Sequence, residues 1–392
     1  MLIEIIIALT IGIIAGTITG LIPGIHTNLI GAILISMITS FYFNPTYTIT
    51  FITSMAITHT FIDFIPTTFL GCSDTTTELG ILPSHELLKS KRGFEAVNLA
   101  NKGSLIAIIL TIIILPISIF ILKPTYSTIE KLIPYLLIII SILLISKEKN
   151  KILSLFIFLL TGLLGYSINQ IENLTQPLLP LLTGLFGASN IFLSLNNKTK
   201  IPKQIITKSK IEMNQPIISS LISAPICSFL PGIGSSQAAI IGNTIKRNSK
   251  KQFLVLIGIT NTFVMSFSLI TLFLINKTRT GAAITINEIL PTATTNYLIL
   301  IIIITTITGI FAFHLTNKIA RIIALNFNKI NYKFLSYITL ALLTIIVLII
   351  SKTTGLLILA ISTLTGIYTI KKGIRRTNMM GCLIIPTIIW LI

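Results

Sequence analysis

Charged residues, and acidic residues above all, are scarce in this sequence. Of its 392 residues only 10% are charged, and 11 Asp and Glu stand against 29 Lys and Arg. A soluble domain usually carries about 25% charged residues. The longest polar stretch, 72–103, is too short to build a hydrophobic core of its own. The net charge of +18 would favour a nucleic-acid partner in a soluble protein. Here the scarcity of charge excludes an ordinary soluble domain, and we expect no nucleic acid.

Cysteine and histidine are equally rare, and their spacing suggests neither a metal nor a redox centre. Cys72, Cys227 and Cys382 form no C-x-x-C pair, so we expect free thiols that pack as small apolar residues. The four histidines are scattered, and no cysteine adjoins them. No hydrolase triad or phosphate loop accompanies them. We therefore expect no metal, no cofactor and no enzymatic activity.

What the chain does contain is long apolar runs. It is 53% hydrophobic, and its mean hydropathy is +0.94. The runs lie at about 2–43, 46–70, 104–122, 132–146, 151–168 and 176–195, then at 216–245, 252–276, 298–316, 334–350, 354–370 and 379–392. Runs of this length predict an all-α polytopic membrane protein. The first residues lack a basic segment and a cleavage site, so we read them as a membrane element rather than a signal peptide.

Two Pro-Gly pairs interrupt the first run of each half. Pro23 and Gly24 break the apolar run at 2–43, and Pro231 and Gly232 break the run at 216–245. Polar residues follow each break: His26, Thr27 and Asn28 in the first half, and Ser235, Ser236 and Gln237 in the second. Helix caps alone would explain these side chains. Alternatively, two broken helices whose ends converge near the membrane midplane form a substrate site for an anion.

The basic residues predict the orientation of the chain. Six loops hold 24 of the 29 Lys and Arg, namely 72–103, 147–151, 198–210, 246–251, 318–333 and 371–376. With these loops in the cytoplasm, the rule that cytoplasmic loops are positively charged is obeyed, and both termini lie outside the plasma membrane.

The same orientation predicts two inverted repeats. Each would be a broken or re-entrant helical element followed by about five transmembrane helices. We expect a first membrane repeat at 1–195, a basic cytoplasmic linker at 196–215 and a second, inverted repeat at 216–392. Short echoes support the duplication, because I-T-H-T-F at 57–61 corresponds to I-T-N-T-F at 259–263.

Asp63 is the one acid well inside a predicted span, and His59 lies one helical turn before it. Ionisable groups at membrane depth are costly and commonly serve ion or proton coupling. We therefore predict an ion-coupling group of His59 and Asp63, together with Asn261 at the position that echoes His59. Two alternatives stay open. Asp63 would cap a helix end or meet water where Pro66 stops the helix, and a single neighbouring hydroxyl would satisfy His59.

A polar run follows Pro66, from Thr67 through Asp74 to Glu78. Its hydroxyl and carboxylate oxygens suit Na⁺, so Thr67 and Asp74 join the predicted ion-coupling residues. An ordinary cytoplasmic loop with helix caps is an equally good reading. For 84–98, which includes Arg92 and Glu95, we expect an interfacial helix pair with a solvated basic face.

Several stretches are similar to one known family. They are P-G-I-H-T-N (23–28), T-H-T-F-I-D-F-I-P (58–66), L-P-S-H-E-L-L-K-S-K-R-G-F-E-A-V (82–97), P-L-L-P-L-L-T-G-L-F-G (177–187), L-P-G-I-G-S-S-Q-A-A (230–239) and K-T-R-T-G-A-A (277–283). The chain resembles the TctA-like permeases, also known as DUF112, especially their archaeal branch. The resemblance implies a multi-spanning carrier of tricarboxylates driven by an ion gradient. In bacterial members a small membrane subunit and an extracytoplasmic binding protein assist it.

Together these features predict a secondary transporter that moves a small organic anion, a carboxylate in particular, coupled to Na⁺ or H⁺. A translocase of a lipid phosphate such as polyprenyl phosphate would share the architecture and the anion site. A non-transporting membrane scaffold would instead pack its broken helices dry against their neighbours.

Overall fold

A computed structural model describes residues 2–22, 30, 31, 34, 44–71, 76–172, 174, 176–195, 202–230, 234–290, 294–326 and 332–392. All regular secondary structure in these residues is helical, which confirms the predicted all-α fold. Within the same residues, eight helical segments are long and apolar enough to cross a membrane, where Gly93–Leu122 and Pro124–Ser146, the two parts of one long helix, are counted separately. The chain is therefore a multi-pass membrane protein.

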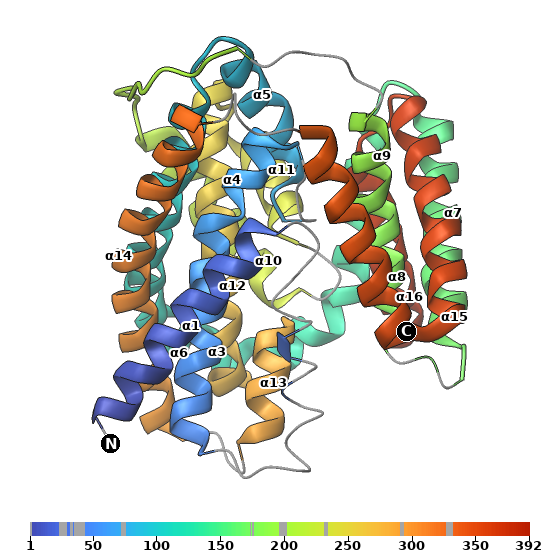
Figure 1. Ribbon diagram of the computed structural model, residues 1–392. Coiled ribbons are helices and arrows are strands. Elements are labelled where there is room, and N and C mark those ends of the chain that lie inside the picture. Colours follow the sequence, from blue (N-terminus) through green and yellow to red (C-terminus); the bar gives the residue numbers. More distant parts are fainter. Residues whose placement is uncertain are drawn as a thin grey trace.

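The helices form two bundles that lie side by side (Figure 1). The first bundle, on the left of the view, contains α1 (Leu2–Leu21), α3 (Pro45–Ile62), α4 (Phe64–Phe69), η1 (Glu78–Gly80), α5 (Ile81–Lys89), α10 (Asn214–Phe229), α11 (Ser235–Ile245), α12 (Lys250–Ile275), α13 (Gly281–Ile289) and α14 (Thr295–Asn326). The second bundle, on the right, contains α7 (Lys151–Asn169), α8 (Leu178–Leu182), the π-helix η2 (Thr183–Ala188), α9 (Ser189–Leu195), α15 (Tyr332–Lys371), η4 (Arg376–Met380) and α16 (Gly381–Leu391).

One helix, α6 (Gly93–Ser146), belongs to both bundles. Residues of its first half, such as Leu110, share a hydrophobic cluster with α12, whereas Leu137 in its second half packs with α7. The sequence predicts two separate spans at 104–122 and 132–146, but no loop divides them. Pro116, Pro124 and Pro134 all lie within the continuous helix.

The predicted spans at 334–350 and 354–370 are the two helical parts of α15, which non-helical Lys352, with a positive φ of 54°, separates at the predicted place. The predicted span at 176–195 is one uninterrupted helical stretch in which α8, the π-helix η2 and α9 follow one another directly, and its apolar part, Leu178–Leu193, is shorter than a full span. The last apolar segment, which ends in α16, is shorter than a full span.

Helices α3 and α12 lie at the centre of the first bundle. Of the apolar 18-residue stretch in each of the spans Pro45–Phe69 and Lys250–Ile275, 94% of the residues are buried. Glycines let their neighbours approach closely, as is typical of helices packed in a membrane. Gly12, Gly16 and Gly20 follow one face of α1; a Cβ atom on Gly16 would lie 2.4 Å from the carbonyl oxygen of Met55 in α3. A Cβ atom on Gly258 of α12 would lie 2.0 Å from a carbonyl oxygen of α6.

The predicted basic loops are gathered at one end of the molecule by direct contacts. Lys250 forms an ion pair with Glu86, at 2.7 Å, and Lys251 forms one with Glu95, at 3.1 Å. At the same end Asn98 donates a hydrogen bond to Asn317, the residue before the basic loop at 318–333. The loops at 147–151 and 371–376 meet where Arg375 contacts Glu148, 3.2 Å away.

The expected solvated face at 84–98 is wrong for Glu95. Its side chain is fully buried, accepts two hydrogen bonds from Arg92 and accepts further ones from Ser209 and Thr207. A buried carboxylate needs such partners to offset its desolvation. Because Thr207 and Ser209 lie in the non-helical segment between α9 and α10, Glu95 anchors that segment to the first bundle.

Candidate functional site

Asp63 lies at the contact between the two central helices. It follows the last residue of α3, and its side chain is only 3% exposed. The amide nitrogen Nδ2 of Asn261, on α12, donates a hydrogen bond to its Oδ2 atom over 2.8 Å. The chain continues past Asp63 into α4, so Pro66 does not end the span, and the burial contradicts the alternative in which Asp63 meets water. The sequence-predicted pair of Asp63 and Asn261 is thus brought together.

Thr67 connects Asp63 to the polar run that follows it. The Thr67 hydroxyl donates to the backbone oxygen of Asp63, at 2.7 Å, and lies 2.9 Å from the hydroxyl of Thr77. Next to Thr77, the backbone oxygen of Thr76 accepts a hydrogen bond from the Ser235 hydroxyl, at 3.1 Å. A short series of polar contacts therefore leads from the backbone of Asp63 to the start of α11.

His59 faces a different neighbour. Its Nδ1 atom lies 3.0 Å from the hydroxyl of Thr19 on α1, and the residue is 1% exposed. This is the contact that the structural alternative for His59 requires. The proximity of His59 to Asp63 along the helix does not by itself give it a part in ion coupling.

The second broken helix brings three predicted residues into the interior. Ser235, Ser236 and Gln237 form the first turn of α11, and all three are buried. The Oε1 atom of Gln237 accepts a hydrogen bond from the backbone nitrogen of Gly234, at 2.9 Å, which caps the helix start. Its Nε2 atom is buried and makes no hydrogen bond within the described residues. The amide therefore offers an unused donor beside the break.

The remaining predicted residues lie outside the residues that the structure describes. They are Pro23, Gly24, His26, Thr27, Asn28, Asp74, Pro231 and Gly232. Of the residues that follow the first break, the structure describes 30, 31 and 34, and Gly31 lies against α13. A Cβ atom on Gly31 would be 2.3 Å from the hydroxyl oxygen of Thr285 and 3.4 Å from the carbonyl oxygen of Gly281.

Arg279, which lies in the motif K-T-R-T-G-A-A at 277–283, is not singled out in the sequence analysis. Its Nη1 atom is buried and makes no hydrogen bond within the part of the chain that the structure describes. The thiol of Cys227, four residues before Pro231, lies within electrostatic range of the guanidinium. Arg279 also stands two residues before Gly281, which Gly31 approaches. The guanidinium therefore lies near α10 and in the short connection between α12 and α13.

A sequence signal for Arg279 does exist. Only a few residues separate α12 from α13, and Thr280 caps α13 by accepting a hydrogen bond from the backbone nitrogen of Ala283. So short a connection between two apolar helices holds its arginine close to both of them.

These residues have clear chemical capabilities. The carboxylate and hydroxyl oxygens around Asp63 suit a proton or a hard cation. An unused amide donor and a guanidinium suit an anion, and a carboxylate can accept two parallel hydrogen bonds from arginine. No group of three His, Cys, Asp or Glu side chains that could hold a metal occurs in the described residues.

Fold and site together define a multi-pass membrane protein with a polar interior around its two central helices. Residues 6–381 match the Tripartite tricarboxylate transporter TctA family, and the chain belongs to this family. It is 32% identical, over 375 residues, to an uncharacterized protein of Methanocaldococcus jannaschii, with 89% of this chain and 90% of that protein covered. No solved structure matches. Members of the family are components of transporters rather than enzymes.

Proposed function

We propose that this protein is a permease that moves a small organic anion, a carboxylate, across the plasma membrane and couples this movement to Na⁺ or H⁺. Membership of the TctA family supports a tricarboxylate-type substrate. The observation that carries the proposal is the contact between Asp63 and Asn261 at the junction of the two central helices. An acid kept at such a depth is costly and is rarely retained without a role.

In this mechanism the ion and the anion occupy neighbouring sites. Asp63 binds the coupling cation or proton, assisted by Asn261 and by the hydroxyl of Thr67. The anion binds at the two breaks, where Gln237 donates a hydrogen bond and Arg279 balances the negative charge. The polar contacts through Thr67, Thr77, Thr76 and Ser235 connect the two sites, so that occupancy of one affects the other.

The proposed architecture is two inverted repeats, at 1–195 and 216–392. The order of the described elements supports it: α1 and the buried central helix α3 in the first half correspond to α10 and the buried central helix α12 in the second. The basic loops gathered at one end would face the cytoplasm. A small membrane subunit and an extracytoplasmic binding protein would be the partners, as the family name suggests.

The test is gradient-driven uptake of labelled citrate and related carboxylates by purified protein in proteoliposomes. Asp63→Asn keeps the shape of the side chain and removes its charge, so we expect uptake to fall at least about tenfold, equivalent to about 1.4 kcal/mol. Glu172→Gln, a change in an exposed acid, is the matched control and should transport normally. Undiminished uptake by Asp63→Asn would remove Asp63 from the mechanism, and the absence of any gradient-driven anion uptake would reject the proposed function.

A further inference from the structure

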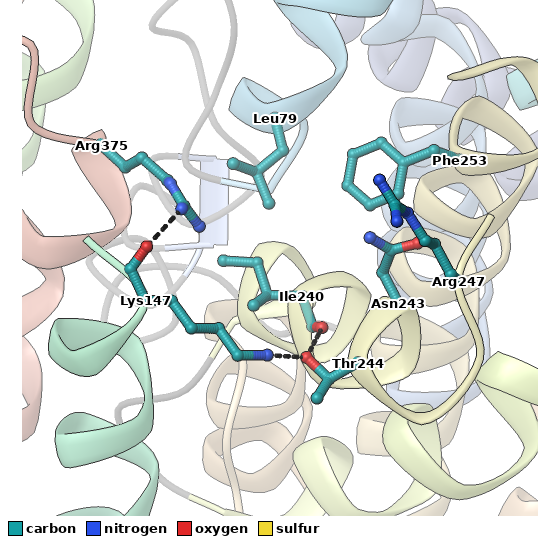
Figure 2. A pocket seen from close by; sticks show the side chains of 8 residues that line it. All are labelled: Leu79, Lys147, Ile240, Asn243, Thr244, Arg247, Phe253 and Arg375. Carbon is teal, nitrogen blue, oxygen red and sulfur yellow. Dashed lines mark hydrogen bonds between the residues drawn. The ribbon is translucent and has the colours of Figure 1, made fainter. Parts of the chain in front are cut away.

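A basic pocket lies between the two bundles at the end where the positively charged loops gather (Figure 2). Its volume is about 440 Å³. Asn243, Thr244 and Arg247 line it from the end of α11 and the residues that follow, and Lys147 and Arg375 line it from the opposite side. Leu79, Ile240 and Phe253 complete the lining with apolar surface. The pocket therefore combines three cationic side chains with amide and hydroxyl groups.

The positive charge in this pocket is only partly balanced. Glu148 is the acid that contacts the cluster within the described residues, and it pairs with Arg375 without lining the pocket itself. Arg375 also donates a hydrogen bond to the backbone oxygen of Lys147, at 2.9 Å. Arg247 is exposed and forms no ion pair within the same residues. One acid against three cations leaves a net charge of about +2 around the cavity.

Lys147 lies within electrostatic range of a second cation of the pocket, Arg375. Its ammonium group donates a hydrogen bond to the hydroxyl of Thr244 on the first bundle. Burial, and secondly the nearby Arg375, lower the pKa of Lys147. An anion in the pocket would relieve the repulsion between these two cations.

The pocket is also connected to the second break in the chain. Helix α11 begins at Ser235, beside the break, and its last turn reaches Thr244 in the pocket wall. At 1.5 Å per residue this separation is about 14 Å along the helix axis, so the pocket is distinct from the site at the breaks.

We propose that this pocket is a second anion site that binds a polyvalent oxyanion, either a di- or tricarboxylate or a phosphate, between the two bundles. This inference rests on the proposed function in one respect, because it makes the pocket the vestibule through which the carried anion passes at the basic end. Three cations and the amide of Asn243 match such a ligand, whereas a monovalent or neutral solute would leave the charge unbalanced. Salt weakens binding at a partly exposed site of this kind.

The experiment measures binding of citrate, and separately of inorganic phosphate, to the full-length protein in detergent by isothermal titration calorimetry. Arg247→Gln removes a cation that makes no contact needed by the fold, and Arg321→Gln, an exposed arginine on α14, is the matched control. We expect Arg247→Gln to weaken the binding of citrate or phosphate about tenfold and the control to leave it unchanged. Raising NaCl from 50 to 500 mM, as experimental settings, should weaken wild-type binding in the same direction.

Two outcomes separate this inference from the proposed function. If Arg247→Gln binds both anions as tightly as the wild type, the second site does not exist, even where uptake in proteoliposomes is normal. If no anion is transported but binding still depends on Arg247, the pocket stands and the proposed function fails. Arg279→Gln should retain the binding that depends on Arg247, because Arg279 does not line this pocket.

Discussion

The hydroxyl of Thr262 donates a hydrogen bond to the hydroxyl of Thr60, 3.1 Å away. The two threonines hold the same place in the echoing sequences at 57–61 and 259–263, so each contacts its own counterpart. Counterparts can touch only near the axis that relates them, as in any two-fold arrangement. This contact supports the proposed inverted repeats and locates their axis between α3 and α12, beside Asp63.

The contact between Asp63 and Asn261 should be energetically significant. Asn261→Ala removes the amide that donates to a buried carboxylate, so we expect a loss of about 2 kcal/mol in the free energy of unfolding. In an Asp63→Asn background the same substitution should cost less, because the charge is gone. Thermal or denaturant unfolding in detergent would measure this double-mutant cycle. Asn326→Ala, on an exposed part of α14, is the control, and equal costs in both backgrounds would contradict the coupling.

Arg279 should determine how tightly the anion is held. We expect Arg279→Gln to raise the KM for citrate uptake at least about tenfold, equivalent to about 1.4 kcal/mol, with Arg279→Lys intermediate because a lysine keeps the charge but not the planar fork. The control is Lys277→Gln, two residues away, since Lys277 is exposed and pairs with Glu130. A KM for Arg279→Gln equal to that of the wild type would exclude the residue from the anion site.

The glycine face of α1 should tolerate no bulky side chain. A Cβ atom on Gly16 already meets a backbone oxygen of α3, and backbone atoms cannot rotate away. We expect Gly16→Leu to cost about 3 kcal/mol or more and to abolish the monodisperse peak in size-exclusion chromatography, with Gly16→Ala milder. Ile14→Ala, on the exposed face of the same helix, should behave as the wild type. Normal yield and stability of Gly16→Leu would show that α1 is free to move.

Stability should fall in mild acid because of His85, on α5. Burial, with positive charges at Lys89 and Arg376, lowers the pKa of His85 from 6.5 to about 4. Between these values only the unfolded chain takes up the proton. The contribution of neutral His85 to the free energy of unfolding is therefore complete above pH 6.5. It is lost as the pH falls toward 4, by at most about 1.4 kcal/mol per pH unit.

Melting temperatures between pH 4.5 and 7.5 would measure this effect of His85. We expect His85→Gln to flatten the pH dependence in that range. His314→Gln, at an exposed position of α14, should keep the slope of the wild type. A slope that persists unchanged in His85→Gln would assign it to other groups.

The apolar runs predict the helices well, since membrane-spanning length and composition are local properties of the sequence. The echoing motifs also single out Asn261, at the position that corresponds to His59, before its contact with Asp63 is known. The burial of Glu95 and of the Nη1 atom of Arg279 is not predicted, for the opposite reason. Charge counting places a residue in a loop by its position in the chain, whereas tertiary contacts decide whether that loop turns inward. Glu95 is buried by Ser209 and Lys251, which are more than a hundred residues away in sequence.

Helix α6 carries the backbone from one bundle to the other without an intervening loop. Any displacement of one bundle relative to the other must therefore be absorbed as bending of this helix. Pro124 lies between the two halves of α6 and lacks an amide hydrogen, so one helical hydrogen bond is already missing there. Bending at Pro124 therefore breaks fewer hydrogen bonds than bending at a residue that has its amide hydrogen. The stiffness of a single helix, rather than the strength of contacts between the bundles, would then limit how far and how fast the two halves can move.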